Sequence, residues 1–222
     1  MKFKKNLNWF LRTGTLGLYA RKRWPTKVVG RDQIPNEAYV LVVGPHKTGK
    51  ETVIVPAHLQ EYEYHIMAKA SLFAIPVFGW IFTKAGGIPV FRKDGRAADV
   101  IGPSVEELRK GFPILIFPES TRFYDPALHR GKAGAVRIAL LANSLIVLAG
   151  LRGMMNTAPD AERSIHLGVF DPRAELEKIR QTRTEKLSDA EGARLVTDVM
   201  MEQLAELANT VYDNQDERDD RA

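Results

Sequence analysis

The sequence contains no cysteine among its 222 residues. This absence excludes disulfide bonds, thiolate metal ligands and a cysteine nucleophile. A chain of this length with 45% hydrophobic residues can bury a full core without such cross-links. We therefore expect one globular domain that is stabilised by packing alone.

The sequence also lacks a long hydrophobic run. The longest apolar stretch extends from Leu72 to Phe82 and is interrupted by Pro76 and Gly79. It is about half of the ~20 residues that a membrane-spanning helix requires. The protein is therefore expected to lie on a membrane and not to cross a bilayer.

Acidic residues are missing from residues 1–31, which carry nine lysines and arginines. Such a basic segment requires an anionic partner, either nucleic acid or anionic lipid. Apolar and aromatic residues alternate with the basic clusters here, which is typical of a helix lying among lipid headgroups. These residues include Leu7–Leu11, Leu16, Leu18, Tyr19 and Trp24.

The pattern favours an anionic membrane surface as the partner, with no nucleic acid, and a peripheral location on the cytoplasmic face of the cell membrane. The alternative is an ordinary helix packed on the domain, because Gly14 and Gly17 weaken the helix. We predict a basic amphipathic segment over residues 1–27, a folded domain over 28–212 and an acidic tail over 213–222.

Short apolar runs typical of buried strands alternate with segments of helical spacing. This alternation predicts an α/β domain whose central, mostly buried sheet is flanked by helices, with the basic segment as a helical extension. The predicted strands are Tyr39–Val43, Gly87–Phe91, Pro113–Phe117 and Leu145–Ala149. The predicted helices are Thr52–Glu61, Ala97–Lys110, Ala133–Ala142 and two segments within 174–211 that separate near Ser188, whereas 72–82 is too broken for one helix.

Polar clusters follow three of the predicted strands, at positions 45–51, 92–93 and 119–122. Ligands of open α/β sheets bind beyond the carboxyl ends of strands. If the clusters converge, they combine a histidine, His46, with a carboxylate and several cationic groups. This set suits the activation of a hydroxyl beside a bound phosphate.

Glu51 is the carboxylate that would orient His46, but residues five apart differ by 140° on a regular helix. The two side chains meet only if the junction before the helix turns back, and Gly49 makes such a turn possible. The same segment partly matches a phosphate-binding P-loop, through Gly44, Gly49 and Lys50. The final Ser or Thr of that motif is Glu51 here, so a nucleotide-binding enzyme stays an alternative.

In order, the three clusters resemble the lysophosphatidate (1-acylglycerol-3-phosphate) acyltransferase family. That family has a histidine followed after four residues by an aspartate, then Gly-x-x-x-x-Arg, then Phe-Pro-Glu-Gly-Thr-Arg. The corresponding segments here are 46–51, 87–92 and 117–122, and the resemblance covers roughly residues 28–151. Lys132 resembles the family's Lys-x-Gly-Ala helix start.

The resemblance implies a glycerolipid acyltransferase-like fold and transfer of a fatty acyl group from acyl-CoA or acyl carrier protein to a lysophosphatidate-like hydroxyl. It implies no metal and no tightly bound cofactor. The implied catalytic residues are His46 and Glu51. The implied substrate-binding residues are Arg92, Glu119, Ser120, Thr121, Arg122 and Lys132.

Glu51 replaces the family's aspartate and Ser120 replaces a glycine, which restricts the turn. These departures leave the acceptor open, as well as a third hypothesis, a non-catalytic module that binds a lipid surface. His129 follows the third block and could approach the site, although a loop role is expected. His58, His65 and His166 are expected to have no part in the chemistry.

Overall fold

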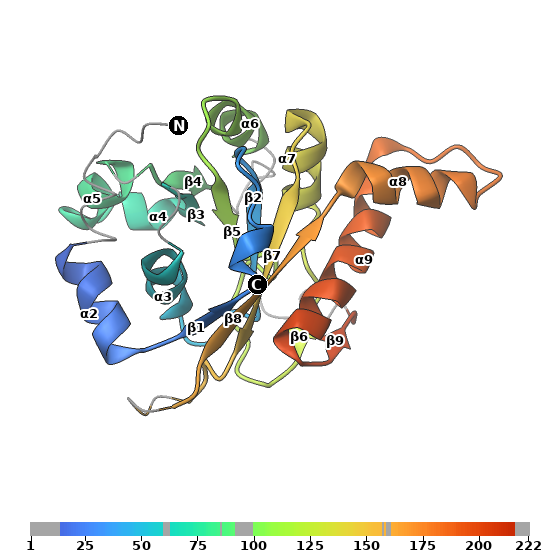
Figure 1. The fold of residues 1–222 in the computed structure, drawn as a ribbon. Helices are drawn as coiled ribbons and strands as arrows, with labels where there is room; N and C mark the ends of the chain where they lie inside the picture. The colour runs from blue at the N-terminus through green and yellow to red at the C-terminus, as the bar shows by residue number, and fades with distance from the viewer. Residues whose placement is uncertain are drawn as a thin grey trace.

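The computed structural model describes residues 14–59, 63–84, 86–91, 100–156, 158 and 161–215 (Figure 1). Its main feature is a seven-stranded sheet in the order β1-β8-β7-β2-β5-β3-β4. Strands β7, β2, β5, β3 and β4 are mutually parallel, β8 is antiparallel to β7, and β1 is parallel to β8. In chain order the strands are β1 Lys27–Val29, β2 Val40–Gly44, β3 His65–Lys69, β4 Ile88–Val90, β5 Ile114–Ile116, β7 Ile146–Arg152 and β8 Ser164–Phe170.

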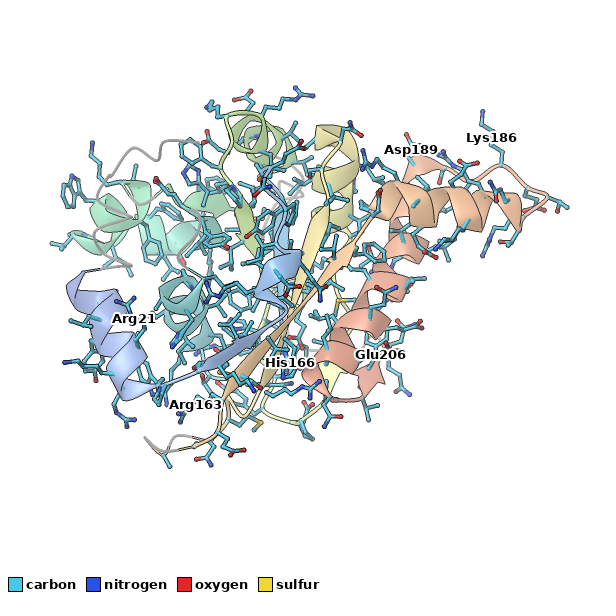
Figure 2. The ribbon with its side chains drawn as sticks, viewed as in Figure 1. Arg21, Arg163, His166, Lys186, Asp189 and Glu206 are labelled. Carbon is cyan, nitrogen blue, oxygen red and sulfur yellow. The ribbon has the colours of Figure 1, made fainter. Side chains whose placement is uncertain are left out.

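Helices cover both faces of this sheet (Figure 1). In chain order they are α2 Thr15–Arg23, the short 3₁₀ helix η1 Arg31–Gln33, α3 Glu51–His58, α4 Ala70–Phe73, α5 Phe78–Lys84, α6 Ile101–Arg109, α7 Gly134–Ala142, α8 Pro172–Gln181 and α9 Asp189–Ala208. Figure 2 labels Asp189 and Glu206, which mark the two ends of α9. A second, two-stranded sheet joins β6 (Leu128–His129) to β9 (Tyr212–Asp213).

The core has two parts because the central strand β2 alternates its side chains between the two faces. Val40 and Val42 pack in one cluster with residues of α6, α7 and α9. Tyr39, Leu41 and Val43 pack in the other cluster with residues of α3. All five residues of β2 are buried, which explains its continuous apolar sequence.

The predicted α/β class is confirmed, and the predicted strands correspond to β2, β4, β5 and β7. The predicted helices correspond to α3, α6, α7, α8 and α9, with residues 60–61 and 97–99 outside the described part. Ser188 is the N-cap of α9 and explains the predicted break. The 72–82 stretch forms no single helix, since α4 and α5 share it. Strands β1, β3 and β8 and the small sheet were not predicted from the sequence.

The predicted terminal segments are only partly within the described residues, because positions 1–13 and 216–222 lie outside them. Helix α2 packs against α3, and Arg21 donates a hydrogen bond of 3.1 Å from Nη1 to the carbonyl of Ala57. Asp213, the first residue of the predicted acidic tail, lies in β9.

Among the described residues, none of the helices has the length and apolar character needed to cross a membrane.

Candidate active site

The loops that follow β2 and β5 meet at the carboxyl edge of the sheet. The two strands are parallel neighbours, and Val42 lies opposite Ile116. The loop after β2 carries His46, and the loop after β5 carries Phe117, Pro118 and Glu119. Adjacent parallel strands therefore bring the first and third predicted polar clusters together, as the topology of open α/β sheets requires.

His46 is held on several sides by the loop that follows β5. Its ring stacks on Phe117, with ring centroids 4.2 Å apart. Its backbone N–H donates to Glu119 Oε2 at 2.6 Å, and its carbonyl accepts from the Phe123 N–H at 3.3 Å. The side chain retains 14% exposure, so the imidazole is fixed in place and still reachable from solvent.

Glu51 faces the imidazole from the first turn of α3. His46 Nδ1 and Glu51 Oε2 are 3.7 Å apart, somewhat longer than a hydrogen bond, and within the described residues neither buried atom has a hydrogen-bond partner. The pair meets because α3 begins only at Glu51, so that His46 lies in the preceding loop. Gly49 has a φ of 82° and turns the loop back, as the sequence requires for this pairing.

The carboxylate of Glu51 is fully buried, and one of its two oxygens accepts three hydrogen bonds. Its Oε1 accepts the N–H of Lys47 at 3.2 Å and the N–H and hydroxyl of Thr48 at 2.8 and 3.1 Å. Burial alone would raise the pKa of Glu51, but the interaction with His46 and the backbone donors outweigh it and lower this pKa to about 2. Glu51 is therefore negatively charged at neutral pH and can stabilise a positive charge on His46.

Glu119 is also fully buried, and each of its oxygens accepts a backbone N–H. Oε2 accepts from His46 and Oε1 accepts from His129, the latter at 3.0 Å. Burial raises the pKa of Glu119, and the two backbone donors oppose that rise. This geometry favours a positioning role for the carboxylate over the substrate contact that the resemblance implies.

The remaining implied substrate-binding residues differ in how the structure places them. Arg122 is exposed, and its guanidinium lies against Gly49. A Cβ atom on residue 49 would be only 3.3 Å from Arg122 Nη1. Ser120 has a φ of 60°, a conformation that glycine adopts more easily. Thr121 and Lys132 are exposed, and the Lys132 N–H donates to the Pro118 carbonyl at 2.9 Å. Arg92 lies outside the described residues.

Four amides of the loop between β2 and α3 are already bonded within the protein. The N–H groups of Lys47 and Thr48 donate to Glu51, that of His46 donates to Glu119, and that of Lys50 donates to the Thr48 hydroxyl. A P-loop directs such amides at a phosphate. Here the buried carboxylates of Glu51 and Glu119 accept three of these amides instead, which disfavours the P-loop interpretation.

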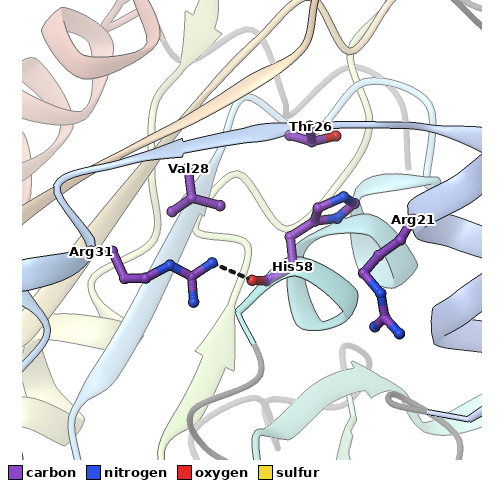
Figure 3. Close-up of a pocket in the computed structure, with 5 residues that line it drawn as sticks. All are labelled: Arg21, Thr26, Val28, Arg31 and His58. Atoms are coloured by element: carbon purple, nitrogen blue, oxygen red, sulfur yellow. Dashed lines mark hydrogen bonds between the residues drawn. The ribbon is translucent and has the colours of Figure 1, made fainter.

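A separate hollow of about 350 Å³ lies between α2, β1 and the end of α3 (Figure 3). Its lining residues are Arg21, Thr26, Val28, Arg31 and His58. Arg31 donates from Nη2 to the His58 carbonyl at 2.7 Å, and Arg21 bonds the Ala57 carbonyl. The arginines bond the last carbonyls of α3, roughly 10 Å along the helix from Glu51. We interpret this hollow as the place where α2 and η1 dock on α3.

A buried cluster beside the candidate site was not predicted from the sequence. Lys47 is 2% exposed, and its ammonium group contacts the loop after β5. His129, expected to have a loop role, is buried in β6 and bonds Glu119 through its backbone. Only the proximity of His129 to the third block indicated this arrangement. Within the described residues no group of three or more His, Asp or Glu side chains is arranged to hold a metal ion.

Fold and site together define an α/β protein with a His–carboxylate pair at the end of a central strand. The model of the acyltransferase family matches residues 25–151, more than half of the chain, so the protein belongs to the acyltransferase family. The matched segment includes His46, Glu51, Glu119 and Arg122.

Several curated relatives are named 1-acyl-sn-glycerol-3-phosphate acyltransferases. The chloroplastic enzyme BAT2 of Brassica napus is 27% identical over 166 residues, which cover 69% of this chain and 47% of the relative. The Streptococcus pneumoniae enzyme is 29% identical over 126 residues, covering 56% and 46% of the two chains. The chain thus spans about half the length of these relatives.

A solved structure has the same fold. It is the crystal structure of the 1-acyl-sn-glycerophosphate acyltransferase PlsC from Thermotoga maritima, with a TM-score of 0.63 and 18% sequence identity. The similarity covers 86% of this chain and 78% of that one. It confirms the acyltransferase-like fold that the resemblance implied.

Proposed function

We propose that the protein transfers a fatty acyl group from an acyl thioester to the free hydroxyl of a lysophosphatidate-like glycerolipid. The observation that carries this proposal is the pairing of His46 with the buried, negatively charged Glu51 at the end of β2. Membership in the acyltransferase family and the names of the relatives support the same reaction. The proposed step belongs to phospholipid biosynthesis.

In the proposed reaction, His46 acts as the general base. Its imidazole takes the proton of the acceptor hydroxyl while the hydroxyl oxygen attacks the thioester carbonyl carbon. The tetrahedral intermediate expels the thiolate, which takes the proton back from the imidazolium, so that an ester and a thiol are formed. Glu51 Oε2, 3.7 Å from Nδ1, stabilises the positive charge during this cycle. A general base of this kind contributes about 10²–10⁴-fold in rate.

The acceptor's phosphate requires cationic groups close to His46. Arg122 is exposed beside Gly49, at the loop that holds His46, and is the cation best placed for this contact. Arg92 and Lys132 complete the proposed phosphate-binding set, together with Ser120 and Thr121 of the same turn. Lysophosphatidate is the proposed acceptor because the relatives are named for it.

Acyl-CoA and acyl carrier protein are both compatible donors, because the proposed chemistry involves only the thioester group. We propose that the reaction uses no metal and no tightly bound cofactor, since proton transfer and charge stabilisation can both come from His46 and Glu51. The donor is therefore a substrate and leaves as a free thiol.

We further propose that the protein works on the cytoplasmic face of an anionic membrane, to which it binds peripherally. Exposed large apolar side chains on α2 and on the α4–α5 segment support this proposal, and both elements lie on the left in Figure 1. We call this set the membrane-facing surface: Leu16, Leu18, Tyr19, Leu72, Ile75, Val77 and Trp80. The basic residues of 1–31 would add attraction to anionic headgroups, each about 1 kcal/mol.

The test is an acyl-transfer assay on anionic vesicles that contain lysophosphatidate, with a long-chain acyl-CoA or acyl carrier protein as donor. Because the chain has no cysteine, every released thiol comes from the donor. We expect thiol release that depends on the acceptor and produces phosphatidate. Glycerol 3-phosphate and other lysophospholipids, offered in its place, identify the acceptor.

Vesicle binding without thiol release from either donor, with any of these acceptors, would contradict the proposal and favour a non-catalytic lipid-binding module. Hydrolysis of ATP in the presence of magnesium, lost on Lys50→Ala substitution, would instead favour the P-loop interpretation.

A further inference from the structure

A charged cluster behind the candidate active site involves residues that the proposed chemistry does not use. His129 lies between two aspartates, with Nε2 2.8 Å from Asp125 and Nδ1 3.6 Å from Asp213. His129 is 6% exposed, and its ring stacks on Phe123 at a centroid distance of 3.8 Å. The imidazole is thus enclosed by protein, and we take the cluster to act within the fold.

Lys47 connects this cluster directly to the loop of His46. Its ammonium group donates a hydrogen bond to the Ala127 carbonyl and lies 3.8 Å from Asp125 Oδ1. Asp125 therefore lies between the Lys47 ammonium group and the His129 imidazole. Asp125 and Lys47 join the segment that follows His46 to the segment that precedes β6.

Glu119 provides a second connection, through the backbone. One of its oxygens accepts the N–H of His46 and the other accepts the N–H of His129. A displacement of β6 would move Glu119, and with it the backbone of His46. The small β6–β9 sheet fixes β6 in turn, since Leu128 pairs with Tyr212 and His129 with Asp213.

We propose that His129 and Asp125, supported by Asp213 of the C-terminal strand, are positioning residues that hold the imidazole of His46 in its reactive place. The expected loss of kcat rests on the function proposed above. The expected effect on the position of the His46 ring does not depend on that function. The positioning residues act through Glu119 and Lys47 and contact no reacting atom. They lie outside the motifs that carry the family resemblance.

The test compares His129→Gln, Asp125→Asn and the double variant with His166→Gln as a matched control. His166 lies on β8, and its ring contacts Ser164 (Figure 2). We expect each single variant to lower kcat for acyl transfer by about 10- to 100-fold with little change in KM. The double variant should be no slower than either single variant, because both changes break the same connection. His166→Gln should match the wild type.

Two further variants separate positioning from folding. Asp125→Glu retains the carboxylate and should keep kcat within about threefold of the wild type, because long carboxylates can rebuild an ion pair at a partly exposed site. Asp213→Asn changes only strand β9 and should also lower kcat. This variant keeps the proposal testable if His129→Gln fails to fold.

The NMR signals of the five histidine rings provide a readout that needs no activity. We expect the His46 signals to shift in His129→Gln, Asp125→Asn and Asp213→Asn and to stay unchanged in His166→Gln. Unshifted His46 signals, or multiplicative losses of kcat in the double variant, would overturn the proposal. If the wild type transfers no acyl group, the proposed function fails while the NMR comparison still decides whether the cluster positions His46.

Discussion

Glu51 has one methylene more than the aspartate that the family carries at this position, and its surroundings use that length. One carboxylate oxygen reaches back over the turn to the N–H groups of Lys47 and Thr48, while the other faces His46. The residue thus ties the loop to the first turn of α3 and also orients the imidazole. These two roles predict separable consequences for activity and for stability.

The activity prediction uses variants of this carboxylate. Glu51→Asp withdraws the carboxylate by about 1.5 Å, one carbon–carbon bond. We expect kcat to fall about tenfold with Glu51→Asp and about 100-fold with Glu51→Gln, since orientation is lost in the first and charge in the second. Steady-state thiol release measures both. Activity that Glu51→Asp creates from an inactive wild type would show that the native chain is not an enzyme.

The stability prediction follows from the lowered pKa of Glu51. Its folded-state value of about 2 lies below the ordinary value of 4.5, so the carboxylate stabilises the fold above pH 4.5. This contribution, of about 3 kcal/mol, is lost as the pH falls from 4.5 to 2. Urea unfolding of the wild type and Glu51→Gln should therefore show a difference in free energy that shrinks over this range. A difference that is independent of pH would contradict the assignment.

At the scale of elements, the strands that are buried on both faces were the easiest to predict from the sequence. The segments that became β2, β5 and β7 are continuous runs of Val, Ile and Leu, and such runs have few other interpretations. Strand β3, with the sequence His-Ile-Met-Ala-Lys, lacks this signature, and its strand character comes from its neighbours β5 and β4. Strand β8 alternates buried and more exposed residues over Ile165–Leu167, which is the period-2 pattern of a strand with one covered face.

The site was predictable where its residues follow strands and unpredictable where distant segments meet. His46 and Glu119 could be placed together because β2 and β5 end at one edge. The contact of His129 with Asp213 joins residues far apart in the chain through a two-residue strand pair. No local pattern specifies such a pairing, because each strand is too short to have a periodicity.

The capping box of α9 allows a test at this scale. The Ser188 side chain accepts from the Glu191 N–H, and the Glu191 side chain accepts from the Ser188 N–H. We expect Ser188→Ala to lower the free energy of unfolding by about 1 kcal/mol, because α9 packs on the central strands and unfolds with them. Chemical denaturation measures the change. An unchanged unfolding free energy would mean that the cap adds nothing to the fold.

At the scale of the whole molecule, the proposed membrane-facing surface and the candidate active site lie on a common framework. Helix α2, which carries part of that surface, packs against α3, whose first residue is Glu51. The Nζ atom of Lys50 also lies 5.9 Å from the ring centroid of Trp24, the residue that follows α2. Binding of α2 to a membrane would therefore hold the loop of His46 close to the lipid surface.

Vesicle binding tests this arrangement. Trp80 is 60% exposed, and its burial among lipid headgroups should strengthen binding. We expect Trp80→Ser to weaken binding to anionic vesicles about tenfold, whereas Leu141→Ser, on α7 and 59% exposed, should not change it. Co-sedimentation at low and high salt measures both variants. Equal effects of the two substitutions would show that the proposed surface is not the one that meets the membrane.

The most direct test of the central claim is the rate of acceptor-dependent thiol release by wild type and by His46→Ala on the same vesicles. The proposed mechanism predicts that the wild type releases donor thiol only when lysophosphatidate is present, and that His46→Ala reduces this rate by about 10²–10⁴-fold while remaining folded and bound. A His46→Ala variant that keeps the wild-type rate would contradict the assignment of His46 as the base.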